Sequence, residues 1–435
     1  MKRFLPFVAI SAILFLALGF TSCGAASCDV HEGKWKVTRV ATCTKEGEEL
    51  FVCRKCGYEE SHVIEKIPHD FVLQGYTPHE DGNVCSTATY ECSACHLERE
   101  EVIAEHHFVF QRNEGLQSDG VFGIDRFECE ICHEEKNALS LTSSSAFSFT
   151  CGGRDYSVNF FDDLLDGDGQ PKACQPIQGL SLRYVPEERC VSVQANGVSL
   201  SRAAFSAMPV RIELSGENSF GVFTSDTESV SLTGDGSLSL DSFSSKGMLA
   251  LYGAALRVTD ETPDLSAALS CGWLETYDGA SLRVTKKTSE TGVEALHAFE
   301  VLGGKVSIIN FRVGASSAYF RFTGGKVSVT GDSSQGSVGF SLKDKTYVRL
   351  IKGCNVSVSS VATGFSAPNT AYITVEEESR LEIASSLCAV QEGISFRFST
   401  LYYCGEDKNT AEESTKYVSA RYILCEKTAR YSGDY

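Results

Sequence analysis

Three pairs of cysteines, each with two residues between them, are the strongest chemical signal in the sequence: Cys53–Cys56, Cys92–Cys95 and Cys129–Cys132. A histidine precedes each pair at a nearly constant distance: His31 by 22 residues, His69 by 23 and His107 by 22. Successive histidines are 38 residues apart both times. This phasing identifies a threefold repeat. It also makes the histidines candidate metal ligands, whereas a lone histidine is more often structural.

Each complete unit of the repeat supplies one histidine and three cysteines. Cys43 and Cys85 lie between histidine and pair in the first two units, and Asp119 holds the position of Cys43 in the third. These are ligands for a tetrahedral Zn²⁺, which would supply the folding energy of such a short, polar unit. The predicted structural zinc ligands are His31, Cys43, Cys53, Cys56, His69, Cys85, Cys92, Cys95, His107, Cys129 and Cys132.

The grouping of these ligands stays open in the sequence. If each repeat begins with its own histidine, His31 also has a role as a ligand. We therefore expect His31 to share a site with Cys43, Cys53 and Cys56. In the alternative register, His69 closes that site instead. Disulfides, which form outside the cell, are the alternative to metal, whereas redox chemistry would need a βαβ context that these short charged segments lack. The third unit, without its middle cysteine, would bind metal weakly or not at all.

The sequence pattern of one repeat resembles a known type of repeat. Residues 43–69 contain a cysteine, a CxxC pair followed by glycine, acidic and β-branched residues, and then Pro-His-Asp-Phe. This phrase is similar to repeats in surface proteins of anaerobic bacteria. The resemblance covers about a quarter of the chain and implies a surface location, with no activity attached to it.

Aromatic and arginine side chains form a second candidate site farther along the chain. In several short alternating runs these residues fall on the side opposite the apolar ones. Aromatic rings stack on sugar faces and polar neighbours bind hydroxyl groups, although tyrosine also favours exposed strand positions through propensity alone. The candidate ligand-binding residues are Trp273, Tyr277, Tyr319, Arg321, Tyr347, Arg349 and Tyr372.

Acidic residues give little support for catalysis. Asp162, Asp163, Asp166 and Asp168 look calcium-like, but the spacing of an EF-hand loop is absent. Asp260, Glu261 and Asp264 cluster in one loop, and Asp332 and Asp344 are isolated. Because no nucleophile and base form a pair, we assign no catalytic residue. A polysaccharide lyase or glycoside hydrolase remains the alternative to a non-catalytic binder, and a purely structural surface protein is a third possibility.

A recurring phrase from residue 234 onward indicates the fold that would position this second site. A turn, usually with glycine, is followed by an apolar, a polar and an apolar residue. Successive copies are 18, 26, 24, 21, 29 and 25 residues apart, which suits turns of a β-solenoid whose loops vary in length. Stacked turns would place one inward column at Leu238, Leu256, Leu282, Val306, Val327, Val356 and Leu381.

This arrangement resembles right-handed parallel β-helices, including bacterial carbohydrate-binding solenoids and pectate-lyase-like enzymes. The resemblance implies a mostly β chain, with small zinc-ribbon-like repeats followed by a parallel β-helix; β-sandwich domains are the alternative. We expect the repeats at 23–137, a β-rich cap or first part of the solenoid at 138–205, the helix at 206–390 and a second cap at 391–435.

The amino terminus predicts export. Met1-Lys2-Arg3 precedes an apolar run from residue 4 to 20 and then Thr21-Ser22-Cys23-Gly24, which resembles a lipoprotein signal peptide over residues 1–22. Cys23 would carry the lipid, although Phe20 replaces the usual leucine of the lipobox. We expect a membrane anchor with the chain on the extracellular side. Cleavage after Ala26, which would release a soluble protein, is the alternative.

The composition narrows the partners. The net charge is −18 and the pI is near 5.0. Nucleic-acid phosphates and anionic lipid surfaces are therefore poor partners, because both require clustered lysine and arginine. A polysaccharide or another surface protein remains as the expected ligand, with the membrane reached through the lipid anchor.

Overall fold

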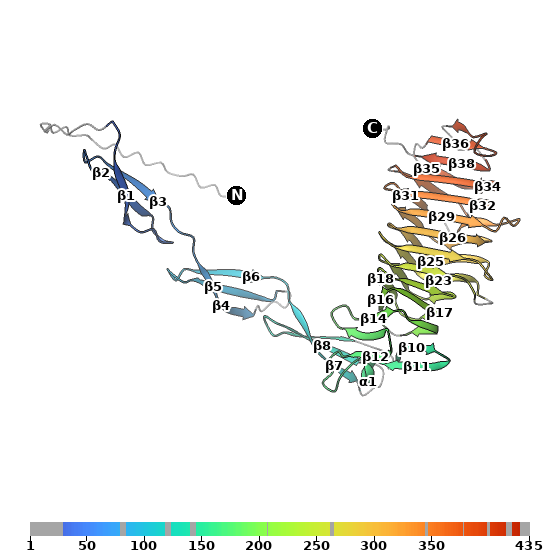
Figure 1. The fold of residues 1–435 in the computed structure, drawn as a ribbon, viewed down its shortest axis with the longest axis horizontal. Helices are drawn as coiled ribbons and strands as arrows, with labels where there is room; N and C mark the ends of the chain where they lie inside the picture. Colours follow the sequence, from blue (N-terminus) through green and yellow to red (C-terminus); the bar gives the residue numbers. More distant parts are fainter. Residues whose placement is uncertain are drawn as a thin grey trace, which may run out of the picture. The chain divides into compact units, whose positions relative to one another are not determined.

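The computed structural model describes residues 29–78, 84–117, 123–139, 145–206, 208–261, 265–343, 347–376, 378–397, 401–414 and 420–426. The fold is nearly all β, with 65% of residues in strands and 1% in helix, as the sequence predicted (Figure 1). The chain divides into two compact units, Met1–His107 and Phe108–Tyr435. The second unit begins about 30 residues before the composition changes near residue 138.

Two small antiparallel sheets make up the described part of the first unit. The first module contains β1 (Gly33–Arg39), β2 (Gly47–Cys53) and β3 (Glu59–Ile64). The second module contains β4 (Phe71–Pro78), β5 (Ser86–Cys92) and β6 (Glu98–Ile103). In each module the middle strand pairs with both neighbours, as in a three-stranded meander.

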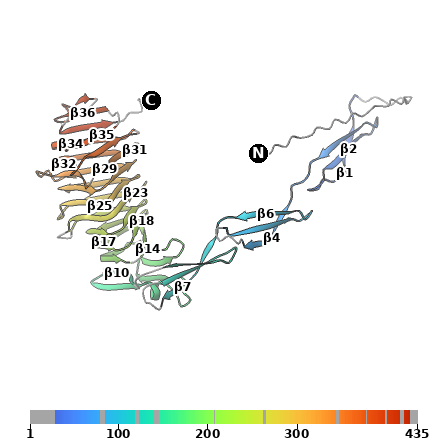
Figure 2. The same ribbon diagram turned by 180° about the vertical axis from the view of Figure 1, so that it is seen from behind.

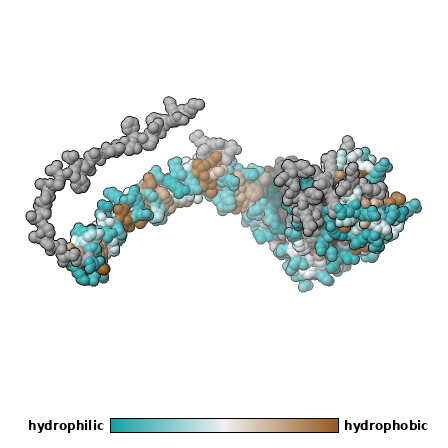
Figure 3. All heavy atoms as spheres, turned by 90° about the horizontal axis from the view of Figure 1, so that it is seen from above, coloured by the Kyte–Doolittle hydropathy of each residue, from teal (hydrophilic) through white to brown (hydrophobic). Residues whose placement is uncertain are grey.

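The two modules have almost no apolar core. Their buried residues are chiefly cysteines and alanines: Ala41, Cys43, Cys53, Cys85, Ala88 and Cys92. Large apolar side chains are instead exposed, including Val30 at 74% and Val63 at 66%, and Figure 3 shows brown patches among the hydrophilic surface here. Because little apolar area leaves water, these sheets need another source of stability.

A third module of the same form opens the second unit. It consists of β7 (Phe108–Leu116), β8 (Gly123–Cys129) and β9 (Glu135–Leu139), all antiparallel. Its buried Asp125 accepts a hydrogen bond from Asn113 Nδ2 at 2.7 Å and another from the hydroxyl of Tyr184. The ring of Phe110 meets the ring of Tyr184 edge-on, with centroids 6.3 Å apart. The third module is thereby packed on the base of the following domain.

The rest of the second unit is a parallel β-solenoid of about eight turns (Figures 1 and 2). Three ladders of parallel strands run along it. The first ladder contains β14 (Cys190–Asn196), β16 (Val210–Ser215), β18 (Ser229–Gly234), β21 (Met248–Leu251), the ends of β23 (Ala267–Thr276) and β25 (Thr291–Val301), β28 (Phe320–Thr323), β31 (Tyr347–Ile351), β33 (Ala371–Val375) and β35 (Ile394–Arg397).

The other two ladders share several long strands that bend between them. The second ladder contains the starts of β15 (Ser199–Phe205) and β17 (Glu217–Ser225), then β19 (Ser237–Leu240), β22 (Ala255–Val258), β24 (Ser281–Thr285), β26 (Lys305–Phe311), β29 (Lys326–Gly331) and the starts of β32 (Asn355–Ser366) and β34 (Arg380–Val390). The third contains the ends of β15, β17, β32 and β34, the starts of β23 and β25, and β20 (Ser242–Ser245), β27 (Val313–Ser317) and β30 (Val338–Leu342).

The inward column predicted from the glycine phrase is confirmed. Its seven residues pair in register from strand to strand of the second ladder, and none is more than 2% exposed. Asn218 occupies this column one turn earlier, where its amide donates to the carbonyls of Ser215 and Ser237 and its oxygen accepts from Val198 N. Parallel pairing in all three ladders excludes the β-sandwich alternative.

Antiparallel strands cover both ends of the solenoid. At the start, β10 (Ser145–Cys151) pairs with β15, and β13 (Leu180–Val185) with β14; β11 (Arg154–Asn159), α1 (Phe160–Asp163) and β12 (Ala173–Ile177) complete this layer. At the other end, β38 (Tyr422–Glu426) pairs with β34 and with β36 (Leu401–Gly405), which also pairs with β37 (Glu412–Ser414). The antiparallel layers use backbone groups that the terminal turns would otherwise leave open.

Candidate metal centres and ligand-binding face

The three CxxC pairs share one backbone turn. The amide of the residue after each pair donates to the carbonyl of the first cysteine: Gly57 to Cys53, His96 to Cys92 and His133 to Cys129, at 2.9–3.0 Å. These three residues have positive φ, between 60° and 71°. The tight turn places both thiols of a pair on one side of the chain, which is the arrangement that a metal ion requires.

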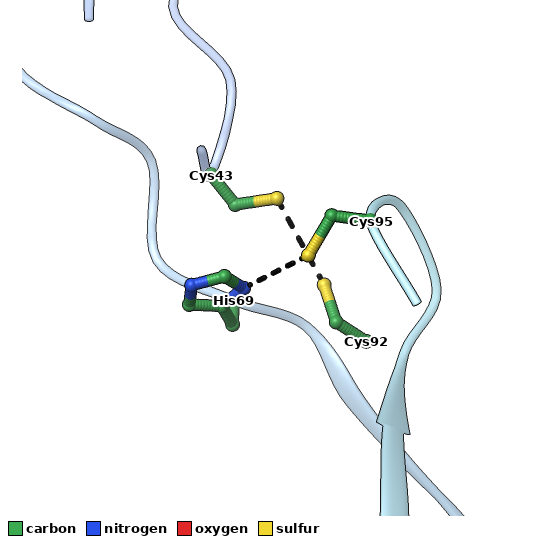
Figure 4. A group of neighbouring side chains, drawn as sticks. All are labelled: Cys43, His69, Cys92 and Cys95. Carbon is green, nitrogen blue, oxygen red and sulfur yellow. Dashed lines mark hydrogen bonds between the residues drawn. The ribbon is translucent and has the colours of Figure 1, made fainter. Parts of the chain in front are cut away.

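One complete ligand set lies within the first unit: Cys43, His69, Cys92 and Cys95 (Figure 4). The ligand atoms all lie within 4.8 Å of one another. The Sγ atoms of Cys43 and Cys92 are 3.9 Å apart, and Cys95 Sγ is 3.3 Å from His69 Nδ1. A tetrahedral ion with metal–sulfur bonds of about 2.3 Å would hold its thiolates about 3.8 Å apart. The residues therefore fit a metal ion of that kind.

The thiols of this set influence one another's ionisation. Hydrogen bonds from the backbone amide of Ala94 and from His69 lower the pKa of Cys92 to about 6, against the effect of burial. Contact with Cys95, burial and contact with Cys92 raise the pKa of Cys43 to about 11. Several thiolates cannot be ionised side by side without a neutralising charge, which a bound cation would supply.

The grouping of ligands corrects the expectation from sequence. Cys43 belongs to the first module, yet it joins the histidine and the CxxC pair of the second, so neither proposed register of the first unit is right. The physical reason is strand β2, which begins at Gly47, four residues after Cys43, and ends at Cys53. Seven extended residues separate the two thiols by roughly 20 Å. A cysteine before the start of this strand is therefore too far from Cys53 and Cys56 to share their site.

The same ligand types recur in the sequence as Cys85, His106, Cys129 and Cys132, although Cys85 precedes its histidine by 21 residues and Cys43 precedes His69 by 26. The histidine whose spacing matches that of His69 is His106 rather than the predicted His107. Its distance to Cys129 is 23 residues, the same as the distance from His69 to Cys92. Because His106 and His107 are adjacent, the approximate spacing does not distinguish them, whereas the 23-residue spacing of the second repeat selects His106.

The first set contains three ligands among the described residues: His31, Cys53 and Cys56. Cys56 Sγ is 3.3 Å from His31 Nδ1, and the His31 ring stacks on Tyr58 at 4.2 Å. Backbone amides of Cys56 and Lys55 lower the pKa of Cys53 to about 5. Cys43, expected here as the fourth ligand, lies in the second set. Cys23, like the rest of the predicted signal segment, and Asp119 lie outside the described residues.

No disulfide joins any of the sixteen cysteines in the described residues. The disulfide alternative for the CxxC repeats therefore finds no support among them, and Cys388, Cys404 and Cys425 of the carboxy-terminal cap are likewise not bonded to one another. In this part of the chain no helix is long and apolar enough to cross a membrane.

Six of the seven predicted aromatic and arginine residues come together along the first ladder, and Tyr277 is the exception. Trp273 is in register with Ala298, and Tyr347 with Tyr372. Tyr319 directly precedes Phe320, which pairs with Val348, so Tyr319 lies beside Tyr347 in this column. Trp273 is 41% exposed and Tyr347 44% exposed, so both rings are open to solvent. Trp273 stacks on His297 at 4.2 Å and Tyr347 on Tyr372 at 5.6 Å.

Charged residues form a second outward column beside the aromatic one. Glu275 pairs in register with Glu300, Glu300 with Arg321, and Arg321 with Arg349. Burial raises the pKa of Glu300, against the effect of Arg321, and Glu275 raises it further. We call these two columns the aromatic face: Trp273, Tyr319, Tyr347 and Tyr372 with Glu275, Glu300, Arg321 and Arg349.

Tyr277 lies just beyond the aromatic face. Its ring stacks on Tyr252 at 4.3 Å, and its hydroxyl donates to Glu275 at 2.7 Å. Burial, followed by this contact with Glu275, raises the pKa of Tyr277. Tyr252 and His297 were not predicted as part of this site, whereas strand alternation does place Glu275 on the same side as Trp273 and Tyr277. The register of the turns, which places Tyr252 one strand before Tyr277, is the signal that could have found the first of them.

The acidic loops have structural roles. Asp163 accepts from Asn159 N, and Asp166 accepts from Asp168 N and Gln170 N, so both close local turns. Asp260 is fully buried and accepts from the backbone amides of Lys287, Thr288 and Ser289. Although burial opposes ionisation, these bonds and that from the Ser289 hydroxyl lower the pKa of Asp260. This carboxylate links the loops of neighbouring turns.

The comparisons place the chain in no family. Searches against protein-family models, curated proteins and solved structures found no match. The architecture itself defines the class: Cys/His-rich β modules with a metal-competent ligand set, followed by a parallel β-solenoid.

Proposed function

We propose that this chain is an exported surface protein that binds a polysaccharide on its solenoid without cleaving it. The observation that carries the proposal is the aromatic face, where Trp273, Tyr347 and Tyr372 lie in one outward column beside Arg321 and Arg349. Rows of open rings with polar neighbours suit an extended chain of sugars, since rings pack on sugar faces while polar groups bind hydroxyls. Regular repetition along a ladder matches a repeating polymer.

Zinc is the metal that we assign to the amino-terminal modules. Thiolate and imidazole ligands in tetrahedral sets favour Zn²⁺ over Mg²⁺ and Ca²⁺, which prefer oxygen. The Cys43, His69, Cys92 and Cys95 set contributes four such ligands and leaves no open position, so its role would be structural. The sequence spacing extends the same role to Cys85, His106, Cys129 and Cys132.

A lipid on Cys23 is the proposed means of attachment. The basic start, apolar run and small residues around Cys23 support this assignment. We expect the wild-type protein in the membrane fraction and a Cys23→Ser variant in the soluble exported fraction, because acyl chains contribute about 0.8 kcal/mol for each buried methylene. Fractionation with metabolic labelling by a radioactive fatty acid measures both effects. An unlabelled wild-type protein released to the medium would favour cleavage after Ala26.

Polysaccharide binding is tested with two matched double variants of the full chain. Trp273→Ala with Tyr347→Ala removes two rings from the aromatic face. Trp35→Ala with Tyr76→Ala removes a tryptophan and a tyrosine of nearly equal exposure, 39% and 44%, from the amino-terminal modules. We expect the first pair to weaken binding roughly 5- to 100-fold, since each ring contributes about 0.5–1.5 kcal/mol, and the second pair to change it little.

A glycan array followed by titration of each bound polymer provides the measurement. Equal losses in both double variants would contradict a binding site on the aromatic face. Products with new reducing or unsaturated ends would show cleavage and would replace the binder with a β-helix lyase or hydrolase. Absence of binding to every polymer would leave a structural or protein-adhesion role.

A further inference from the structure

We propose that the paired guanidinium groups of Arg321 and Arg349 bind an anionic substituent of the sugar chain, a carboxylate or a sulfate ester. The preferred ligand is then an acidic polysaccharide. This inference rests on the proposed function, because it concerns the same aromatic face. It adds the chemical class of the ligand, and its test is separable from the test for binding itself.

The two arginines repeat as part of a motif. Tyr319-Phe320-Arg321 and Tyr347-Val348-Arg349 occupy successive turns, with Phe320 and Val348 buried and the other side chains directed outward. Arg321 pairs in register with Arg349. Adjacent strands lie about 4.8 Å apart, so the two guanidinium groups are close enough to bind one anion together or two neighbouring anions along a polymer.

The carboxylates near this pair do not saturate its donors. Arg321 Nη1 is 3.7 Å from Glu300, and Arg349 Nη2 is 3.7 Å from Glu376, both longer than a hydrogen bond. Nε of Arg321 is buried without a hydrogen-bond partner. Like charges directly opposite each other on neighbouring strands are unfavourable. An arriving carboxylate or sulfate would accept hydrogen bonds from the outward Nη groups and remove the repulsion.

Aromatic rings flank the arginine pair. Tyr319 is half-buried, and burial raises the pKa of its hydroxyl while both Arg321 and Arg349 act in the opposite direction, as expected if both cations are close to it. The stacked rings of Tyr347 and Tyr372 lie in the neighbouring column. A sugar ring packed on these aromatics would place its charged substituent within reach of the guanidinium groups.

A pair of arginines in register does not by itself indicate an anion-binding site. Arg257 and Arg283 also pair in register on the second ladder, and both are exposed. Their outward neighbours two residues earlier are Ala255 and Ser281, with no aromatic ring. The distinguishing feature of the Arg321–Arg349 pair is its combination with tyrosines. Substitution of Arg257 and Arg283 is therefore a matched control. It removes two positive charges from this chain of net charge −18, as substitution of Arg321 and Arg349 does.

The test titrates the full chain with four polymers. Methyl esterification of polygalacturonate replaces each carboxylate with a neutral methyl ester, and desulfation of a sulfated galactan removes its sulfate esters. We expect at least one charged polymer to bind tenfold or more tightly than its neutral partner. Arg321→Gln with Arg349→Gln should abolish that difference, so that each charged polymer and its neutral partner bind this variant equally. Arg257→Gln with Arg283→Gln should preserve it.

The outcomes separate the inference from the proposed function. A preference for the sulfated galactan assigns a sulfate ester, and a preference for polygalacturonate assigns a carboxylate. Equal binding of charged and neutral polymers that still depends on Trp273 and Tyr347 would overturn the inference and preserve the proposed function. Equal effects of the two arginine double variants would also overturn it, because only net charge would then matter. If none of the four polymers binds and the glycan array finds no other ligand, both the inference and the proposed function are wrong.

Discussion

Replacing Cys43 with serine is expected to destabilise the second module, although Cys43 belongs to the first. The reason is the shared ligand set, in which Cys43 completes the site of His69, Cys92 and Cys95. Structural zinc contributes about 10–16 kcal/mol to small domains of this kind. Loss of a direct ligand should cost more than the 10–100-fold in affinity that changes outside the ligand sphere cost. Hydrogen exchange should therefore accelerate throughout β4–β6.

The measurement combines hydrogen exchange with metal analysis of the purified chain. Cys43→Ser and Cys92→Ser should each lower the zinc content by about one ion per chain. Cys388→Ser, which alters a thiol of the solenoid, should leave both zinc content and exchange unchanged. Removal of the metal from the wild-type protein with a chelator should accelerate hydrogen exchange in β4–β6 in the same way. Rapid exchange confined to β1–β3 in Cys43→Ser would show that the site closes within one module, and a metal-free wild-type protein with slow exchange would refute the zinc assignment.

Asp125→Ala is expected to release the third module from the base of the solenoid. This change leaves the buried hydroxyl of Tyr184 and the amide of Asn113 without their acceptor. Each buried polar group left unsatisfied costs about 1–3 kcal/mol, so a total of about 2–4 kcal/mol is reasonable. Asp125→Asn retains a carbonyl acceptor and should cost much less. Hydrogen exchange of β7–β9 and denaturant unfolding report the two effects.

The pH dependence of the same site gives an independent check. Burial raises the pKa of Asp125 above its ordinary 3.8, against the hydrogen bonds from Tyr184 and Asn113. Its contribution to stability is therefore fully present below pH 3.8 and is lost as the pH rises through the higher pKa of the folded state. Asp125→Asn should remove this pH-dependent part. Equal destabilisation by the alanine and asparagine variants, or an unchanged pH profile in Asp125→Asn, would contradict this role.

Much of the solenoid could be predicted from the sequence because its signal is one-dimensional. Each turn repeats the same inward residue, so the column from Leu238 to Leu381 followed from the glycine phrase alone. Variable loops changed the spacing but not the register. The outward residues followed from the same alternation, which is why the predicted aromatics lie on one ladder. Whether they bind sugar is a question of chemistry that the register does not decide.

The metal ligands show what local spacing cannot resolve. The residue types and the CxxC turns were evident in the sequence. The partners of Cys43 depend on its position before β2, at the end of the strand opposite Cys53. An alternating pattern over residues 47–53 could have placed β2 between Cys43 and Cys53 and excluded a common site. The attachment of the third module through Asp125 was also missed, because its partner Tyr184 is 59 residues away.

The ligand set shared by two modules also determines how the protein would carry load. With metal bound, a pull on the ends of the chain passes directly from Cys43 to Cys92, and residues 44–91 between them bear no tension. Those 48 residues include β2–β5 and could extend by about 160 Å once the metal–sulfur bonds break. The amino-terminal modules would then lengthen under tension, and occupancy of the site would determine whether metal–sulfur bonds must break first.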